Sequence, residues 1–479
     1  MTGPYLIGVD CGTQSAKVVI YDAHGHVMCR GQQALRPMSR PSHGVAVHPD
    51  DDLWDAISAA SRQAMAGFTG DAADIVGVGT CPIRCCKAFL KADGSLAEPV
   101  ISWMDDRAYQ AYLPADPEVR YATTLSGYVA HRFTGAFRDT AANNIEMQWP
   151  IDSDTWHWSE DPARYEQFGV PRDMLFELQM PGEVIGTVTA AAAQATGIPA
   201  GISVVATAND KAVEMLGAGA LDGTTVLISL GTYIAAMVPG SQNFRSPNNF
   251  WTNFACTPQQ YLYESNGVRR GMWTLSWFLD LLGVEVADRA TSVGLSREAY
   301  LEREAAIAPA GSDGLMTVLD WLAPTDKPFR KGMMLGFDAR HTRGHIYRSI
   351  LEAIALTIKF HVDAMAAELG ITLSQIVLSG GGSNSPLFMS IFADVFGIPA
   401  SRSVDGGGGA SLGAAMCAAA AAGVHPSIES AAFEMAGPRE SFVPDLANGA
   451  IYRRMADGIY HDLRSATDAL FERAYPIFH

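Results

Sequence analysis

The apolar and polar positions in the N-terminal part of the chain predict strands that alternate with a helix. Apolar or β-branched runs, typical of strands, occupy residues 5–9, 16–22, 27–31, 75–79 and 87–90. Between the third and fourth runs, apolar residues recur at helical spacing after Pro49, and three aspartates fill the first turn. The last two runs are interpreted as a hairpin, and the whole pattern indicates an α/β fold.

The opening unit of strand, Gly-Thr turn and strand occurs again near the middle of the chain. Its first turn is Gly12-Thr13 and its second is Gly231-Thr232, and each follows an apolar strand. We therefore expect two related domains that face each other. A polar, irregular stretch over 239–249 marks the predicted boundary, which divides the chain into residues 1–240 and 241–479.

The second half of the chain is predicted to be more helical, around a buried strand over 375–379. Helices are expected over 346–369, 386–396 and 410–422. The small residues of the third helix predict close packing under the glycines that close the strand. The expected last helix covers the core with one apolar face, which carries Ile451, Met455, Ile459, Leu463 and Leu470.

The amino-acid composition excludes several classes of protein. The 479 residues suggest about two to four domains, and an apolar fraction of 48% excludes a disordered chain. The formal net charge of −17 argues against nucleic acid and anionic membranes as partners. We expect neither a transmembrane helix, since no run is apolar enough, nor a signal peptide. The seven cysteines make an odd count, so we expect a cytoplasmic protein with reduced thiols.

Two loops combine glycine with polar groups that bind phosphate, namely Asp10–Lys17 and Gly231-Thr232. Backbone N–H groups and a hydroxyl in such a turn cradle phosphate oxygens, and the Asp10 carboxylate can hold Mg²⁺. A third glycine loop, Gly380–Ser385, can let the ring of a nucleotide lie against bare backbone. The alternative in each case is an ordinary turn, with Asp10 as a turn residue and Lys17 solvated.

Asp210 is a second carboxylate that follows an apolar strand, here over 204–208. A carboxylate in the predicted cleft can accept the proton of an attacking hydroxyl during phosphoryl transfer. Because Asn209-Asp210 also precedes a helical run, a helix cap is the alternative interpretation.

The order and spacing of the motifs resemble the FGGY carbohydrate kinases, of the actin/hexokinase/Hsp70 ATPase superfamily, almost from end to end. Besides the loops and Asp210, the motifs are Trp103-x-Asp105-x-Arg107, Phe133-Thr134-Gly135 with Asp139, and segments 187–201, 319–336, 393–399 and 412–415. This resemblance implies an α/β fold of two ribonuclease H-like (actin-like ATPase) domains around an interdomain cleft. It also implies that ATP and Mg²⁺ are the cofactors, and a homodimer is common in the family.

The activity implied by the resemblance is transfer of the γ-phosphate of ATP to a terminal hydroxyl of a small sugar. A ketopentose such as xylulose or ribulose ranks first as the acceptor. Polyols such as erythritol or glycerol, and an autoinducer-2-type ligand, are alternatives. A catalytically weak sugar- and nucleotide-binding sensor is an alternative of a different class, and an actin-like assembly ATPase is disfavoured by the sugar-side motifs.

Matching the family motifs assigns a role to each candidate residue. Asp210 is the expected catalytic base, and Asp10 and Asp210 are the expected Mg²⁺ ligands. The expected nucleotide-binding residues are Gly12, Thr13, Gln14, Lys17, Gly231, Thr232, Gly271, Gly380, Gly381, Gly382 and Ser385. The expected acceptor-binding residues are Arg84, Trp103, Asp105, Asp210 and Lys211. The alternatives are a surface arginine at Arg84, core packing of Trp103, and an ion pair between Asp105 and Arg107.

Three features depart from the family pattern, and one is that only thirteen residues separate Arg107 from Tyr121, where the family usually has a longer helical insert. The segment 77–86 lacks the family's Gln, and its Cys81-x-x-Arg84 is closer to the autoinducer-2 kinases. Lys211 follows the expected base, where the family often has a small or amide residue. It is expected either to contact the acceptor or to pair with Asp210.

Overall fold

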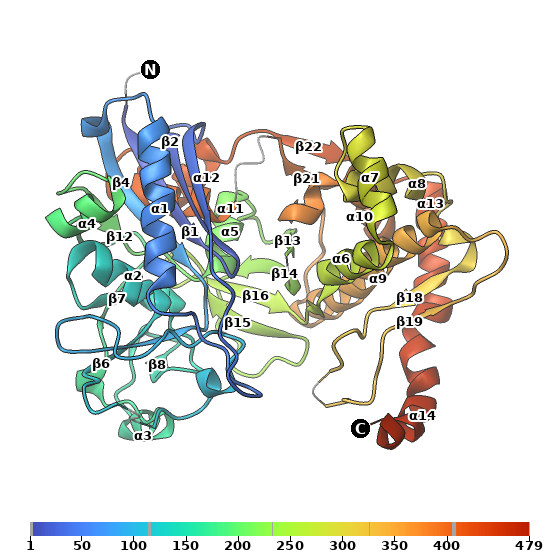
Figure 1. The fold of residues 1–479 in the computed structure, drawn as a ribbon, viewed down its shortest axis with the longest axis horizontal. Helices are drawn as coiled ribbons and strands as arrows, with labels where there is room; N and C mark the ends of the chain where they lie inside the picture. Colours follow the sequence, from blue (N-terminus) through green and yellow to red (C-terminus); the bar gives the residue numbers. More distant parts are fainter. Residues whose placement is uncertain (1–2, 114–115, 232, 325, 405–408, 479) are drawn as a thin grey trace.

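The N-terminal strands form a six-stranded mixed sheet, at the left of Figure 1 in this computed structural model. Its order is β11 (Val184–Thr187), β12 (Ser203–Val205), β4 (Ile75–Pro82), β1 (Tyr5–Cys11), β2 (Ser15–Asp22) and β3 (Val27–Ala34). β1 to β3 are antiparallel neighbours, and β4 runs parallel to β1 and β12. The structure describes all residues except 1–2, 114–115, 232, 325, 405–408 and 479.

Alternate side chains of β1 face opposite sides of this sheet, as a strand requires. Ile7 and Val9 pack in one core with residues of α1 (Asp52–Gly67) and α2 (Leu125–Thr134). Leu6 joins the larger core on the other side, which α11 (Gly409–Ala421) covers. We call this sheet with its helices the first lobe.

α11 approaches the first sheet at backbone distance, because the residues that meet are small. A Cβ atom on Gly8 would lie 1.8 Å from the carbonyl oxygen of Ser411, and one on Gly79 would lie 1.9 Å from that of Ala414. The close packing predicted for this helix is therefore confirmed. The glycines found beneath it belong to the first sheet, whereas the expectation had placed those after strand 375–379 there.

The second lobe is built on an eight-stranded sheet, whose helices lie at the right of Figure 1. The strand order is β15 (Phe250–Phe254), β16 (Tyr261–Ser265), β14 (Tyr233–Gly240), β13 (Thr225–Leu230), β20 (Gln375–Ser379), β21 (Ala400–Ser403) and β22 (Arg439–Phe442), with β17 (Val268–Arg269) beside β14. Its main helices are α6 (Gly271–Leu281), α7 (Val284–Ser292), α8 (Arg297–Ala305), α9 (Arg343–Leu369), α10 (Pro386–Phe396) and α13 (Leu446–Met455). β13 and β20 run parallel, so the loops that follow them lie at the same edge.

The change from one sheet to the other occurs before the predicted boundary at residue 240. That boundary coincides with the end of β14, which pairs with β13 inside the second sheet. We therefore propose that the chain divides between β12 and β13. Because α11 returns to the first lobe, neither lobe is made from one continuous segment.

Short elements complete the two lobes. They are α3 (Pro162–Phe168), α4 (Ala190–Thr196), α5 (Asp210–Gly217), α12 (Ile428–Met435), and the strand pairs β5 (Lys87–Leu90) with β6 (Tyr121–Thr124), β7 (Arg138–Thr140) with β10 (Glu177–Gln179), β8 (Ile151–Asp152) with β9 (His157–Trp158), and β18 (Met316–Val318) with β19 (Met333–Leu335). The predicted hairpin of 75–79 with 87–90 is therefore wrong, because β5 pairs with β6 and β4 pairs with β1 and β12.

The C-terminal helix was also predicted wrongly. A π-helical turn (Ala456–Tyr460) separates α13 from α14 (His461–Phe478) and changes the helical phase. Leu463 is buried, but Ile451, Ile459 and Leu470 are 40%, 46% and 59% exposed. One continuous face therefore does not cover the core.

Candidate functional site

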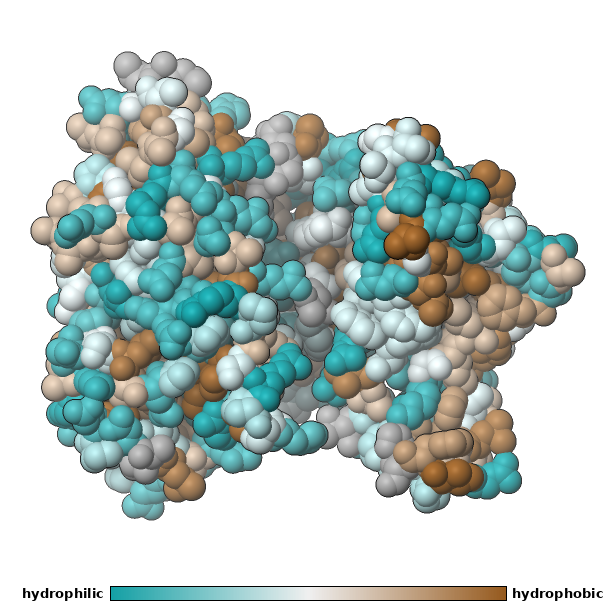
Figure 2. Space-filling view, viewed as in Figure 1, coloured by the Kyte–Doolittle hydropathy of each residue, from teal (hydrophilic) through white to brown (hydrophobic). Residues whose placement is uncertain are grey.

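Figure 2 shows a groove between the lobes, and four chain segments that carry predicted site residues lie at β1, α5, β13 and β20. Asp10 lies near the end of β1, and Asp210 begins α5 a few residues after β12. On the second lobe, the register pairs Ser229 of β13 with Ser379 of β20. The turns that begin at Gly231 and Gly380 follow these two residues, so they are neighbours at one edge of the sheet.

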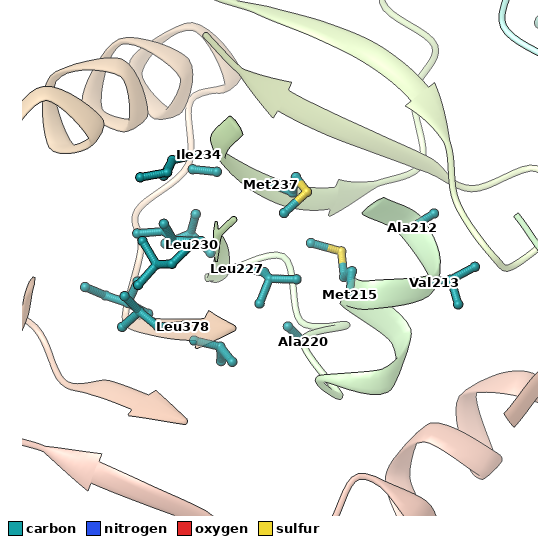
Figure 3. Packing of buried hydrophobic residues seen from close by; sticks show 14 of the residues in the cluster. Ala212, Val213, Met215, Ala220, Leu227, Leu230, Ile234, Met237 and Leu378 are labelled. Carbon is teal, nitrogen blue, oxygen red and sulfur yellow. The ribbon is translucent and has the colours of Figure 1, made fainter. Parts of the chain in front are cut away.

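Hydrophobic packing fixes the helix that carries Asp210. Met215 of α5 lies near Leu227 of β13 and Met237 of β14, all within one buried cluster (Figure 3). The helix begins with Asn209, whose side chain accepts a hydrogen bond from the Ala212 N–H at 3.1 Å. Asn209 therefore provides the cap that the sequence left as an alternative for Asp210.

Burial shapes the acidity of both carboxylates. It raises the pKa of Asp210, and the positive charges of Arg84 and Lys211 only partly offset this effect. Burial also raises the pKa of Asp10 to about 6, against the opposing charge of Lys17, its partner across the β1–β2 pair. A carboxylate that holds a proton more readily than usual suits a general base near neutral pH.

Arg84 is held in place by a carboxylate that sequence reasoning missed. Its Nη1 and Nη2 atoms donate to Glu264 of β16 at 2.6 and 2.8 Å, and its guanidinium lies 4.9 Å from the Trp251 ring centre. Glu264 is fully buried, while the Arg84 Nε lies 3.4 Å from Asp210 Oδ1. Arg84 is therefore no surface arginine, and one signal for Glu264 was available: a charged residue inside an apolar strand requires a partner.

Trp103 and Asp105 take different positions. The Trp103 indole N–H donates to the Thr13 hydroxyl at 3.4 Å, which brings the predicted sugar platform next to the first turn. Asp105 is fully buried and accepts hydrogen bonds from the Ala46 N–H at 2.8 Å and from three N–H groups of Arg107 at 2.7–2.9 Å. This geometry favours the Asp105–Arg107 ion pair over acceptor binding.

We expect Asp105→Ala to lower stability without changing acceptor affinity. Losing the carboxylate leaves the buried Ala46 N–H without its acceptor, at a cost of about 1–3 kcal/mol. The measurements are the thermal midpoint and the acceptor KM. Asp93→Ala is the control, since Asp93 accepts from Ser95 in an exposed turn. A higher acceptor KM at an unchanged midpoint would instead place Asp105 in the acceptor site.

Lys211 points to the second lobe. Its ammonium group donates to Glu214 at 3.0 Å and to the Ser229 hydroxyl at 2.6 Å. These bonds do not include the expected pair with Asp210, and contact of Lys211 with the acceptor stays a prediction. In the first turn, the Gly12 N–H donates to the Ser15 carbonyl at 3.0 Å, and the side chains of Gln14 and Lys17 are exposed.

The glycine loop after β20 leaves backbone accessible. Gly380 has φ +81°, and a Cβ there would lie 2.7 Å from the Leu230 carbonyl oxygen. A Cβ on Gly381 would meet no described atom within 4 Å, so this position is open to a ligand, whereas Gly382 is buried.

The remaining predicted nucleotide residues have local roles in the structure. Ser385 caps α10 by accepting a bond from the Phe388 N–H at 3.1 Å. Gly271 begins α6, where a Cβ would lie 2.4 Å from Ile234 Cδ1. Thr232 lies outside the described residues.

The described residues hold no group of three or more His, Cys, Asp and Glu side chains placed to bind a metal ion. Within the same part of the chain, no helix is both long and apolar enough to cross a membrane.

Two lobes, each built on a mixed sheet, with a groove between them, define the two-domain actin-like ATPase fold. The chain belongs to the FGGY family of carbohydrate kinases: the N-terminal domain of the family matches residues 5–113, and its C-terminal domain matches 226–422. The protein is therefore a sugar kinase, a phosphotransferase, as the sequence motifs predicted.

Individual relatives agree with this assignment. The "uncharacterized sugar kinase YgcE" of Escherichia coli (strain K12) is 47% identical over all of this chain and 97% of its own length. An autoinducer-2 kinase of Klebsiella pneumoniae is 25% identical over 94% of this chain and 92% of its own. The crystal structure of xylulose kinase from Rhodospirillum rubrum matches 99% of this chain and 100% of its own with a TM-score of 0.79 at 23% identity, which shows the shared fold.

Proposed function

We propose that this sugar kinase transfers the γ-phosphate of ATP to a terminal hydroxyl of a small uncharged sugar, with a ketopentose such as xylulose or ribulose as the first candidate. The observation that carries the uncharged acceptor is the pairing of Arg84 with Glu264. Two hydrogen bonds to a buried carboxylate neutralise the guanidinium, so it offers hydroxyl groups a donor but no net positive charge. Asp210 beside it makes the local charge negative, which disfavours a carboxylate on the acceptor.

In the proposed reaction, the acceptor hydroxyl lies beside Asp210, which takes its proton during attack on the γ-phosphorus. Trp103 offers an apolar surface to the sugar, close to the Thr13 hydroxyl of the first phosphate turn. The backbone at Gly231 and Gly381 faces the nucleotide from the second lobe.

The residues at the groove also fit Mg²⁺ bound with ATP. Mg²⁺ in kinases keeps several waters and takes one or two carboxylates besides the phosphates, so a cluster of three protein ligands is not needed. Asp10, near the end of β1, and Asp210, at the start of α5, would supply these carboxylates. The metal would offset negative charge on the phosphates.

Two other classes of acceptor remain alternatives to a ketopentose. Cys81-x-x-Arg84 and the autoinducer-2 kinase relatives favour an autoinducer-2-type ligand. Polyols such as erythritol or glycerol satisfy the same charge argument. The alternative of a sugar- and nucleotide-binding sensor without turnover stays a prediction. The homodimer also stays a prediction.

The test is ADP release measured over a panel of acceptors. We expect kcat/KM for the best ketopentose or polyol to exceed that for aldonates of equal length by at least about 100-fold. Turnover of an aldonate as fast as any neutral acceptor would contradict the proposal, and ADP binding without turnover of any panel member would favour the sensor.

A variant of the carboxylate partner sharpens this test. Glu264→Gln removes one of the two carboxylates beside Arg84 and makes the local charge less negative by one unit, so we expect a smaller preference for neutral acceptors over aldonates. The matched control is Glu440→Gln, which removes the partner of Arg402 at an exposed pair on β21 and β22. An unchanged preference in folded Glu264→Gln protein would show that the Arg84 charge does not select the acceptor.

A further inference from the structure

One carboxylate on α5 connects the helix of Asp210 to both nucleotide-side strands of the second lobe. Glu214 Oε2 accepts hydrogen bonds from Lys211 Nζ at 3.0 Å and from the Ser229 hydroxyl at 2.9 Å. Its Oε1 accepts from the Ser379 hydroxyl at 2.5 Å. Lys211 closes the network by donating to Ser229 at 2.6 Å.

The two serines occupy corresponding positions. Ser229 and Ser379 are paired in the register of β13 and β20, shortly before Gly231 and directly before Gly380. A shift of Glu214 would therefore move both turns relative to α5. Sequence reasoning missed Glu214 because nothing local distinguishes it from other polar residues on a helix.

The charges of the side chains at the groove indicate a role for Lys211 beside the phosphates. Asp10, Asp210 and Glu214 place three carboxylates near the expected phosphates, in a protein of net charge −17. Glu264 pairs with Arg84. Burial raises the pKa of both Asp10 and Asp210, and the charge of Lys211 opposes this rise at both carboxylates, beside the larger effects of Lys17 on Asp10 and of Arg84 on Asp210. Burial opposes ionisation of Glu214, but Lys211 and the two serine hydroxyls outweigh it and lower its pKa.

We propose that Lys211 and Glu214 are positioning residues for the nucleotide: Glu214 holds the turn at Gly231 and the glycine loop at Gly380 against the helix of Asp210 and directs the Lys211 ammonium toward the phosphates. The contacts thus move Lys211 from the acceptor side, where the sequence put it, to the phosphate side. A purely stabilising role for the Lys211–Glu214 pair is the weaker explanation, because the desolvation of two buried charges offsets most of the free energy that their attraction contributes. The inference rests on the proposed use of ATP, but not on the identity of the acceptor.

The experiment measures MgADP binding by calorimetry, together with KM for ATP and for the best acceptor. We expect Lys211→Met to weaken MgADP binding and raise the ATP KM by roughly 10- to 100-fold, the size of a charge-assisted contact, with little change in acceptor KM. Lys211→Arg keeps the charge and should recover most of the affinity. The control is Lys359→Met, which removes a lysine from an exposed pair with Asp363 on α9.

Ser379→Ala tests the network without changing any charge. It removes the hydroxyl that bonds Glu214, so weaker MgADP binding is expected here too, even if Lys211→Met fails to fold. Unchanged MgADP binding in Lys211→Met or Ser379→Ala would overturn the inference, as would a higher acceptor KM with normal ATP kinetics. Because the binding assay needs no acceptor, wild-type protein that binds MgADP but phosphorylates no sugar would refute the proposed function alone.

Discussion

Asp210→Asn is expected to lower kcat by about 10²- to 10⁴-fold, the contribution of a positioned general base. The amide keeps the size of the side chain but cannot take the proton of the acceptor hydroxyl. The fold should persist, because Asn209 caps α5 and Met215 anchors it in the core. The measurement is kcat at saturating ATP and acceptor, with MgADP affinity checked separately.

Asp161→Asn is the matched control for this substitution. Asp161 also lies at the start of a helix, but it caps α3 on the surface by accepting from the Ala163 N–H. This variant should turn over normally. If Asp210→Asn also retained near-normal kcat, another group would have to be the base.

Gly8→Ala is expected to destabilise the protein by about 3 kcal/mol or more, at the upper end of the cost of overpacking. The added Cβ would lie 1.8 Å from the Ser411 carbonyl oxygen, and a backbone atom cannot rotate away as a side chain can. α11 would have to move off β1, and Asp10 lies two residues further along that strand. Thermal and urea unfolding measure the loss, and kcat should fall in parallel.

Gly458→Ala provides the contrast for Gly8→Ala. A Cβ at position 458 would meet no described atom within 4 Å, and alanine loses less backbone entropy than glycine in a helix. Its midpoint should stay the same or rise. A Gly8→Ala midpoint within about 1 °C of wild type would mean that α11 does not contact the sheet as closely as described.

Those parts of the fold whose sequence signals are local could be predicted from the sequence. The strands around Gly12 and Gly231 could be predicted, because apolar runs and glycine turns lie within a few residues of each other. The pairing of β5 could not, since its partner β6 follows only after a long loop. The phase change at 456–460 likewise has no sequence signal that distinguishes a π-helical turn from an α-helix.

The candidate site divides in the same way. Motif spacing predicts that Asp10 and Asp210 lie in the cleft, since Asp10 lies near the end of β1 and Asp210 comes soon after β12. The partner of Arg84 is 180 residues away in the sequence, and Ser379 is 165 residues from Glu214. Contacts between residues so far apart in the sequence depend on how the lobes come together. The charge state of Arg84 and the direction of Lys211 could therefore be found only from the structure.

The return of α11 to the first lobe has a consequence for protein synthesis. The strands of the first sheet are complete once Val205 has been made, but the helix that covers one face ends at Ala421. While the rest of the chain emerges from the ribosome, Leu6 and Tyr21 remain on an uncovered apolar face, the kind of surface that chaperones bind. A gene fragment that stops before Gly409 should therefore yield an aggregating product, and should become soluble when the missing segment is co-expressed.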